Sequence, residues 1–150
     1  MHVARALHSA DGVNEKAEQL QTRTRTFASN VIRFCERLPH SDAARQIAQQ
    51  LVDSAGSTDS NYRAACRGRS VKEFIAKLGV AAEEADESKG WLQLLVQSGI
   101  TGGEPAVSLI QEADELTRIF VSSRKTAEKR KAQREALTKR SNRHSPIDNP

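Results

Sequence analysis

The chain carries apolar residues at steps of three and four positions, which is the spacing of one face of an amphipathic α-helix. The first such helix is predicted over residues 14–37, after a weakly patterned lead over residues 1–13 that we expect to be flexible. Its inward positions are Leu20, Thr24, Phe27, Val31, Phe34 and Leu38. Pro39 predicts the end of this helix, because the residue before a proline is disfavoured in helical geometry.

A second helix is predicted over residues 43–67, with Ser41 or Asp42 accepting hydrogen bonds from its first backbone N–H groups. Its inward stripe consists of Ile47, Ala48, Leu51, Ala55, Thr58, Tyr62 and Ala65. The middle of this helix, SAGS at residues 54–57, is made of small residues, which favour close approach of another backbone. A break at Gly56 is the alternative. Gly68 is predicted to end the helix in a left-handed conformation.

Two further helices are predicted after Gly68. Ser70 and Glu73 match the capping box S-x-x-E, in which each side chain satisfies a backbone donor at the start of the helix. The seam of this third helix is Val71, Phe74, Leu78, Ala81, Ala85, Ser88, Leu92 and Leu95, and Ser98 and Gly99 end it. After a loop at residues 101–105, the fourth helix shows Leu109, Ala113, Leu116, Phe120 and Ser123. No segment predicts a strand.

Four amphipathic helices with short connections predict an all-α, antiparallel up-down-up-down four-helix bundle over residues 14–123. A hairpin at Gly68 would place residues 54–57 opposite residues 81–85, so that small side chains meet small side chains. Close packing requires such complementary volumes.

The charge of the chain is unevenly distributed. Residues 124–150 hold nine Lys or Arg against three acids, a net charge of +6, whereas the whole chain carries +4 and the remainder therefore −2. This flexible basic C-terminal tail is predicted to be a partly disordered segment or a helix extension. A basic tail attracts polyanions such as RNA or DNA without sequence preference, and a merely solvated terminus is the alternative. The candidate nucleic-acid-binding residues are Arg124, Lys125, Lys129, Arg130, Lys131, Arg134, Lys139 and Arg140.

The sequence offers little to support catalysis. It contains no phosphate-binding loop, dinucleotide-binding turn, H-E-x-x-H helix or C-x-x-C pair. The four histidines are scattered, and the two cysteines, Cys35 and Cys66, are expected to pack rather than react. We therefore expect no catalytic residue, no metal, no cofactor, no small-molecule substrate and no enzymatic activity. No apolar run is long enough to cross a bilayer, and neither a secretory signal nor a disulfide scaffold is expected, so a cytoplasmic location is predicted.

Several short motifs resemble a known family of four-helix bundle proteins, some of which are encoded in intervening sequences of bacterial 23S ribosomal RNA genes. The most specific motif is SNYRAACRGRS at residues 60–70. The others are Leu38-Pro39, QLVDSA at 50–55, EFIAKL at 73–78, EEADE at 83–87 and Trp91-Leu92, so that the resemblance covers residues 22–120. It implies a homo-oligomer, a ring of five in relatives of known structure, and no established enzymatic activity. Related bundles are accessory proteins of reverse transcriptases and contact nucleic acid.

The arginines of the most specific motif are predicted to be structural. Arg63 and Arg67 are four residues apart and share one side of a helix, while Arg69 lies in the turn. Planar guanidinium groups suit carboxylates, so we expect ion pairs within and between subunits. The expected interface residues are Arg63, Arg67, Arg69, Glu83, Glu84, Glu87 and Trp91. Binding of phosphates by the three arginines is the alternative.

Overall fold

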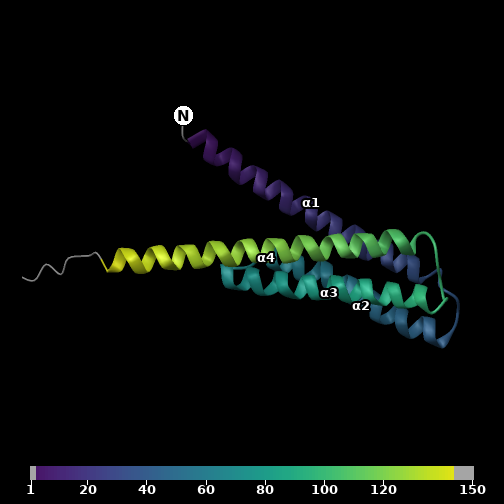
Figure 1. The fold of residues 1–150 in the computed structure, drawn as a ribbon. Coiled ribbons are helices and arrows are strands. Elements are labelled where there is room, and N and C mark those ends of the chain that lie inside the picture. The colour runs from purple at the N-terminus through teal and green to yellow at the C-terminus, as the bar shows by residue number, and fades with distance from the viewer. Residues whose placement is uncertain (1–2, 144–150) are drawn as a thin grey trace, which may run out of the picture.

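Four α-helices run antiparallel to one another in the order of the chain (Figure 1). The computed structural model describes residues 3–143, with side chains described from Gly12 onward. The helices are α1 (Val3–Cys35), α2 (Asp42–Cys66), α3 (Val71–Gln97) and α4 (Ala106–Asn142). Each helix packs on the next, and α1 also contacts α4, which closes the bundle. The described residues contain no strand, and the predicted all-α four-helix bundle is confirmed.

The bounds of α1 differ from the prediction at both ends. The helix begins at Val3 rather than near residue 14, because residues 3–13 contain three alanines and a leucine, which favour helix, and no proline. It ends at Cys35 rather than Arg37. The N–H groups of Arg37 and Leu38 bond to carbonyls only three residues earlier, so the chain tightens into a turn before Pro39.

The predicted helix starts of α2 and α3 are confirmed. Ser41 Oγ accepts a hydrogen bond of 3.1 Å from the N–H of Ala44, and Ser70 Oγ accepts one of 3.1 Å from the N–H of Glu73. The Glu73 carboxylate reaches back to the N–H of Arg69 at 3.0 Å. Helix α2 is continuous through Gly56, so the alternative of a break there is wrong.

Gly68 does not adopt the predicted left-handed conformation. Among the described residues, positive φ angles occur only at Gly99 and Gly103. Gly68 lies in a tight space instead, because an added Cβ would lie 3.1 Å from the Ala65 carbonyl oxygen. The left-handed end belongs to α3, where Gly99 has a φ of 70° and the N–H of Ile100 bonds back to Leu95 at 3.1 Å.

Between α2 and α3 many of the buried side chains are small. Ser54 and Ala55 of α2 are buried, as are Ala81, Ala85 and Ser88 of α3. The hydroxyls of Ser54 and Ser88 bond to each other at 2.9 Å. The predicted small-against-small seam is therefore present, but Ser54 lies opposite a residue one helical turn farther along α3 than the predicted register placed it.

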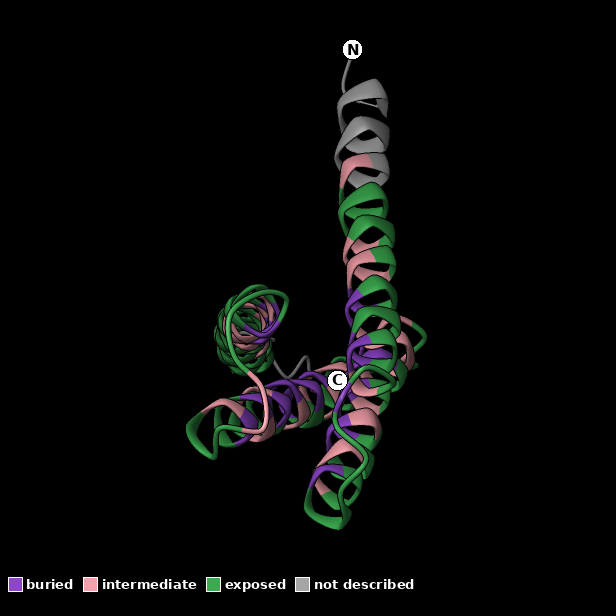
Figure 2. Ribbon diagram, turned by 90° about the vertical axis from the view of Figure 1, so that its right-hand side faces the viewer, coloured by how far each residue is buried: buried purple, intermediate pink, exposed green. Residues whose placement is uncertain are grey.

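Two helices extend beyond the common core. Thr24 is the first buried side chain of α1 among the described residues, and Phe120 is the last of α4. Toward its N-terminus α1 diverges from α4, while α4 continues past the ends of α2 and α3 (Figure 1). Figure 2 shows the buried residues on the sides where the helices face one another. We call residues 124–142 the α4 extension. Arg143 caps it, and the last residues of the predicted tail, 144–150, lie outside the described residues.

None of the helices in the described part of the chain is long and apolar enough to cross a membrane.

Candidate interaction surfaces

A buried carboxylate, Asp59, joins α2 to α1. Thr24 Oγ1 donates a hydrogen bond of 2.9 Å to Asp59 Oδ1, and the Nε atoms of Arg25 and Arg63 lie 3.4 and 3.1 Å from Oδ2. Asp59 is 6% exposed and Thr24 is fully buried. Because a buried charge requires partners within the protein, this cluster fixes the position of α1 on α2. Arg63 thus forms a structural ion pair, but within its own helix.

A second ionic contact holds α1 to α4 beside the point of divergence. Arg23 binds both carboxylate oxygens of Glu112, with Nε 2.6 Å and an Nη 2.8 Å away, and also pairs with Glu115. The hydrogen bond that Arg23 donates to Glu112 is the main cause that raises the pKa of Arg23 above its ordinary value. Neither cluster is predicted from the sequence. One feature of the sequence does indicate that Asp59 is buried: it lies beside Thr58 on an otherwise apolar stripe.

Arg67 and Arg69 are exposed at the turn between α2 and α3. Neither side chain has an ion pair within residues 12–143, and Glu73 bonds to the backbone of Arg69 rather than to a guanidinium group. The structure therefore does not gather the three predicted arginines into one cluster. Arg63 pairs with Asp59 of its own helix, whereas the other two remain available to an external partner.

The acidic residues of the predicted interface lie together on the outer face of α3. Glu83 and Glu87 are exposed and Glu84 is half-buried. Trp91 Nε1 donates a hydrogen bond of 3.0 Å to Glu87 Oε1. Burial, with the neighbouring charges of Glu87 and Glu83, raises the pKa of Glu84 above its ordinary value. Within the described residues none of these three carboxylates pairs with a cation, so their charge is uncompensated.

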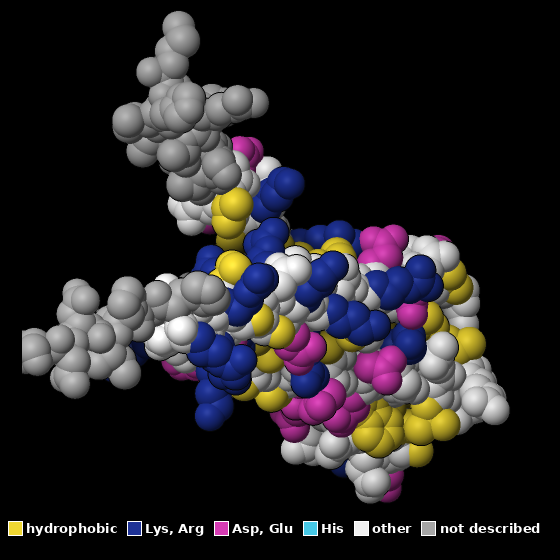
Figure 3. Space-filling view, turned by 60° about the vertical axis from the view of Figure 1, so that its left-hand side comes forward, with side chains coloured by type: hydrophobic (Ala, Val, Ile, Leu, Met, Phe, Trp, Pro, Cys, Tyr) yellow, Lys and Arg dark blue, Asp and Glu magenta, His cyan; other side chains and the backbone are white. Residues whose placement is uncertain are grey.

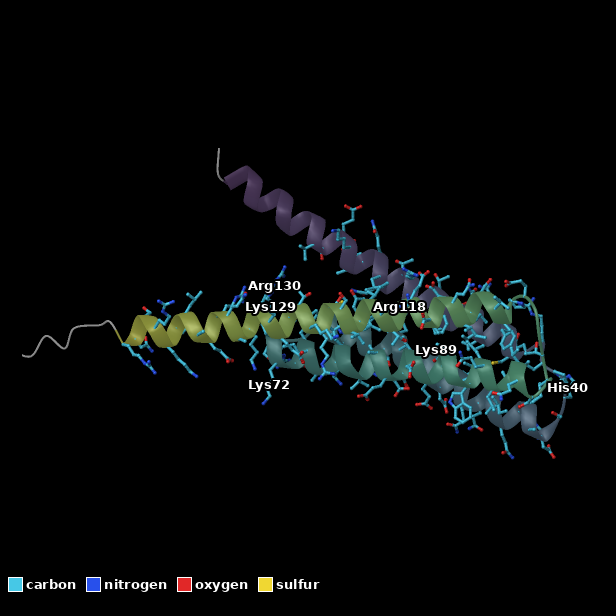
Figure 4. The ribbon with its side chains drawn as sticks, in the orientation of Figure 1. His40, Lys72, Lys89, Arg118, Lys129 and Arg130 are labelled. Atoms are coloured by element: carbon cyan, nitrogen blue, oxygen red, sulfur yellow. The ribbon has the colours of Figure 1, made fainter. Side chains whose placement is uncertain are left out.

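The eight predicted nucleic-acid-binding cations all lie on the α4 extension, but they are not equivalent. Arg124 pairs with Glu128 at 3.0 Å and covers the backbone of Gly79, where an added Cβ would lie 2.9 Å from an Arg124 nitrogen. Lys131 lies 3.7 Å from Glu135. Among the described residues the others have no carboxylate partner, namely Lys125, Lys129, Arg130, Arg134, Lys139 and Arg140. Figure 4 shows Lys129 and Arg130 projecting from the extension.

An apolar cleft of about 800 Å³ opens where α1 diverges from α4. Val13 and Leu20 of α1 form one wall, Phe74 of α3 and Ile119 of α4 the other, and Tyr62 lies among them. The Tyr62 ring packs on Phe120 with ring centres 5.3 Å apart. Burial raises the pKa of Tyr62, so its hydroxyl stays protonated at neutral pH. Lys16 of α1 and Arg69 of the turn between α2 and α3 also line the cleft, so it offers apolar surface with cations beside it.

The cysteines and histidines do not form a reactive site in the described part of the chain. Burial raises the pKa of Cys35 to about 11, and its Sγ lies 3.9 Å from the Ala48 carbonyl oxygen. At neutral pH the Cys35 thiol is thus neutral and a poor nucleophile. His40 is exposed at the turn between α1 and α2, and no group of His, Cys, Asp or Glu in the described residues could hold a metal ion.

Comparison with known proteins identifies this architecture. Residues 16–122 match the family model described as 23S rRNA-intervening sequence protein. A similar solved structure is the crystal structure of a protein with unknown function from the S23 ribosomal protein family of Bacteroides thetaiotaomicron. That protein is 25% identical, the match covers 73% of this chain and 98% of the other, and the TM-score is 0.67. None of the curated proteins matches the chain.

Proposed function

The chain belongs to the family of 23S rRNA-intervening sequence proteins, and on this premise we propose that it is a non-enzymatic, self-associating scaffold protein. It works as a homo-oligomer in the cytoplasm, and a ring of five copies, which the family resemblance implies, is the expected form. Its helices supply surfaces for binding other macromolecules rather than a site for chemistry.

The apolar cleft between α1 and α4 is the observation that carries this proposal. Val13 is 68% exposed, and Leu20 and Phe74 are only partly buried in a single chain. Large uncovered apolar surfaces on a folded protein mark sites of association, because covering them removes apolar area from water. A neighbouring copy would cover this cleft.

Sedimentation velocity over a range of concentrations tests the proposal. We expect the unmodified chain to sediment as a species several times heavier than the 16.5 kDa chain. Val13→Glu should weaken association about tenfold or more, because it places a charge in apolar contact. Val107→Glu is the control, since Val107 is also exposed, at 42%, but lies outside the cleft. An unmodified chain that remains a single copy at every concentration would contradict the proposal.

The α4 extension supports a second function, the binding of nucleic acid. Its eight cations and two glutamates give residues 124–142 a net charge of +6, and six of the cations lack a carboxylate partner within the described residues. Cations on an exposed helix bind phosphates and release the counterions held by the nucleic acid. Because this release is less favourable at higher salt concentration, the affinity falls steeply as salt is added. In this role the protein acts as an accessory that holds RNA or DNA. The exposed Arg67 and Arg69 are the second group of candidates.

Mobility-shift titrations at several salt concentrations test the second function. A variant with Gln in place of Lys125, Lys129 and Arg140 should bind a short RNA or DNA with lower affinity. The slope of the logarithm of affinity against the logarithm of salt concentration should decrease by about one per lost phosphate contact. Arg33→Gln with Arg37→Gln is the control, because these exposed cations lie at the other end of the bundle. Binding that is unchanged after deletion of every residue beyond Ser123 would exclude this role for the extension.

A further inference from the structure

A second hollow, of about 520 Å³, lies between the start of α3 and the α4 extension. Its apolar residues include Val71 and Phe74, and Val71 is 41% exposed. Its charged lining residues are Arg130, Lys131, Arg134 and Glu135, and Glu135 lies 3.7 Å from Lys131. Arg130 and Arg134 have no carboxylate partner in the part of the chain that the structure describes. We call this site the basic hollow; it suits a partner that offers apolar side chains and carboxylates together.

The outer face of α3 offers that combination. Val80, Glu83, Glu87 and Leu94 recur at steps of three, four and seven, so they share one face of the helix, which also carries Glu84 and Trp91. Val80 is 36% exposed and Leu94 is 40% exposed. We call these six residues the acidic ridge. Figure 3 shows acidic side chains beside hydrophobic ones on the body of the bundle, and Lys and Arg gathered along α4.

The acidic ridge cannot reach the basic hollow of its own chain. Glu83, the ridge carboxylate nearest to the hollow, stands nine residues from Phe74 on the same helix, which is about 14 Å at the rise of an α-helix. The two surfaces can therefore meet only between copies.

We propose that the acidic ridge of one copy docks into the basic hollow of the next copy. Carboxylates of Glu83, Glu84 and Glu87 then face Arg130 and Arg134, and Trp91 or Leu94 covers Val71 and Phe74. Because the two surfaces differ, the contact runs head to tail and generates a ring if its rotation closes. This inference rests on the proposed self-association and names the two surfaces that carry part of it.

The unsatisfied charge on both surfaces agrees with this pairing. Partial burial, followed by the neighbouring acids Glu87 and Glu83, raises the pKa of Glu84 within a single copy, which means that its ionised form is disfavoured there. Cations of a neighbouring copy would relieve this repulsion. Opposite charges on two exposed surfaces also give association that weakens as salt screens them.

Charge reversal tests the inference in the full-length chain. Arg130→Glu with Arg134→Glu alters the hollow, and Glu83→Lys with Glu87→Lys alters the ridge. Each pair alone should raise the dissociation constant for self-association about tenfold or more, because like charges then face each other. A chain that carries all four substitutions should associate again, because the complementary charges are exchanged rather than removed.

The matched control reverses the same amount of charge on the other side of the extension. Lys125 and Lys129 lie away from the hollow on α4, so Lys125→Glu with Lys129→Glu should leave self-association unchanged. Circular dichroism verifies that every variant retains its helices.

The outcomes separate this inference from the proposed function. If the unmodified chain associates and both reversed pairs associate equally well, the docking of ridge into hollow is wrong while self-association stands. If the unmodified chain stays a single copy, both fail. If reversal of the hollow abolishes binding of a short RNA or DNA but leaves the mass of the assembly unchanged, the hollow binds nucleic acid and the inference is overturned.

Discussion

Asp59 shows how one buried charge positions two helices. Its carboxylate sits in the interface of α1 and α2 with Thr24 as a hydrogen-bond donor and two arginines as counterions. A buried carboxylate that loses a partner pays its desolvation cost without compensation. The Ser54–Ser88 hydrogen bond plays a similar but uncharged role between α2 and α3. Such residues stabilise one helix register relative to registers displaced along the helix.

The Thr24→Val substitution tests the role of Asp59. The two side chains have nearly the same shape, but valine cannot donate a hydrogen bond to the buried carboxylate. We expect a loss of about 1–3 kcal/mol in the free energy of unfolding, measured by urea titration followed by circular dichroism.

Thr26→Val is the matched control for this prediction. Thr26 is exposed on the same helix, and its hydroxyl bonds only to the carbonyl of Thr22. Its replacement should change stability by no more than about 0.5 kcal/mol. Equal stability of the two variants would show that the Asp59 contact does not hold α1 on α2.

The helices themselves follow from the spacing of apolar residues. The four stripes and the serine caps could be predicted from the sequence because they depend on contacts a few residues apart. The start of α1 could not, because residues 3–13 show helix propensity without a strong stripe. The register of α2 on α3 differs by one helical turn from the predicted register. The turn at Gly68 constrains only the helix ends, and side-chain contacts such as Ser54–Ser88 select the final position.

The small residues between α2 and α3 predict a strict size limit. Ala55 is fully buried, and Ala55→Leu should overpack the seam and cost about 1–3 kcal/mol. The neighbouring Gly56→Ala is the control, because an added Cβ there would meet no atom within 4 Å. That change should stabilise the helix by about 0.5–1 kcal/mol. Thermal unfolding at fixed protein concentration checks both, and an unaltered melting temperature for Ala55→Leu would refute the close packing.

The candidate surfaces could be predicted only in part. Clusters along one helix, such as the acids of α3 and the cations of α4, are evident in the sequence. The cleft and the basic hollow are not, because they arise where α1 diverges and α4 outruns its neighbours, which depends on contacts between distant residues. Arg23 illustrates this limit, since its partner Glu112 lies on the last helix.

The molecule as a whole is a closed four-helix bundle, except at the end where α1 diverges and α4 extends past its neighbours. At this end the apolar cleft and the basic hollow lie side by side and share Val71 and Phe74. The acidic ridge lies farther along α3. A chain with separated, complementary surfaces has the features required for head-to-tail assembly.

Light scattering coupled to size-exclusion chromatography tests this central claim most directly. At low salt we predict a mass several times that of the 16.5 kDa chain. This mass should fall in part as salt screens the charged surfaces, because the apolar contact is not screened. A mass of 16.5 kDa at low salt and at the highest attainable concentration would contradict the account.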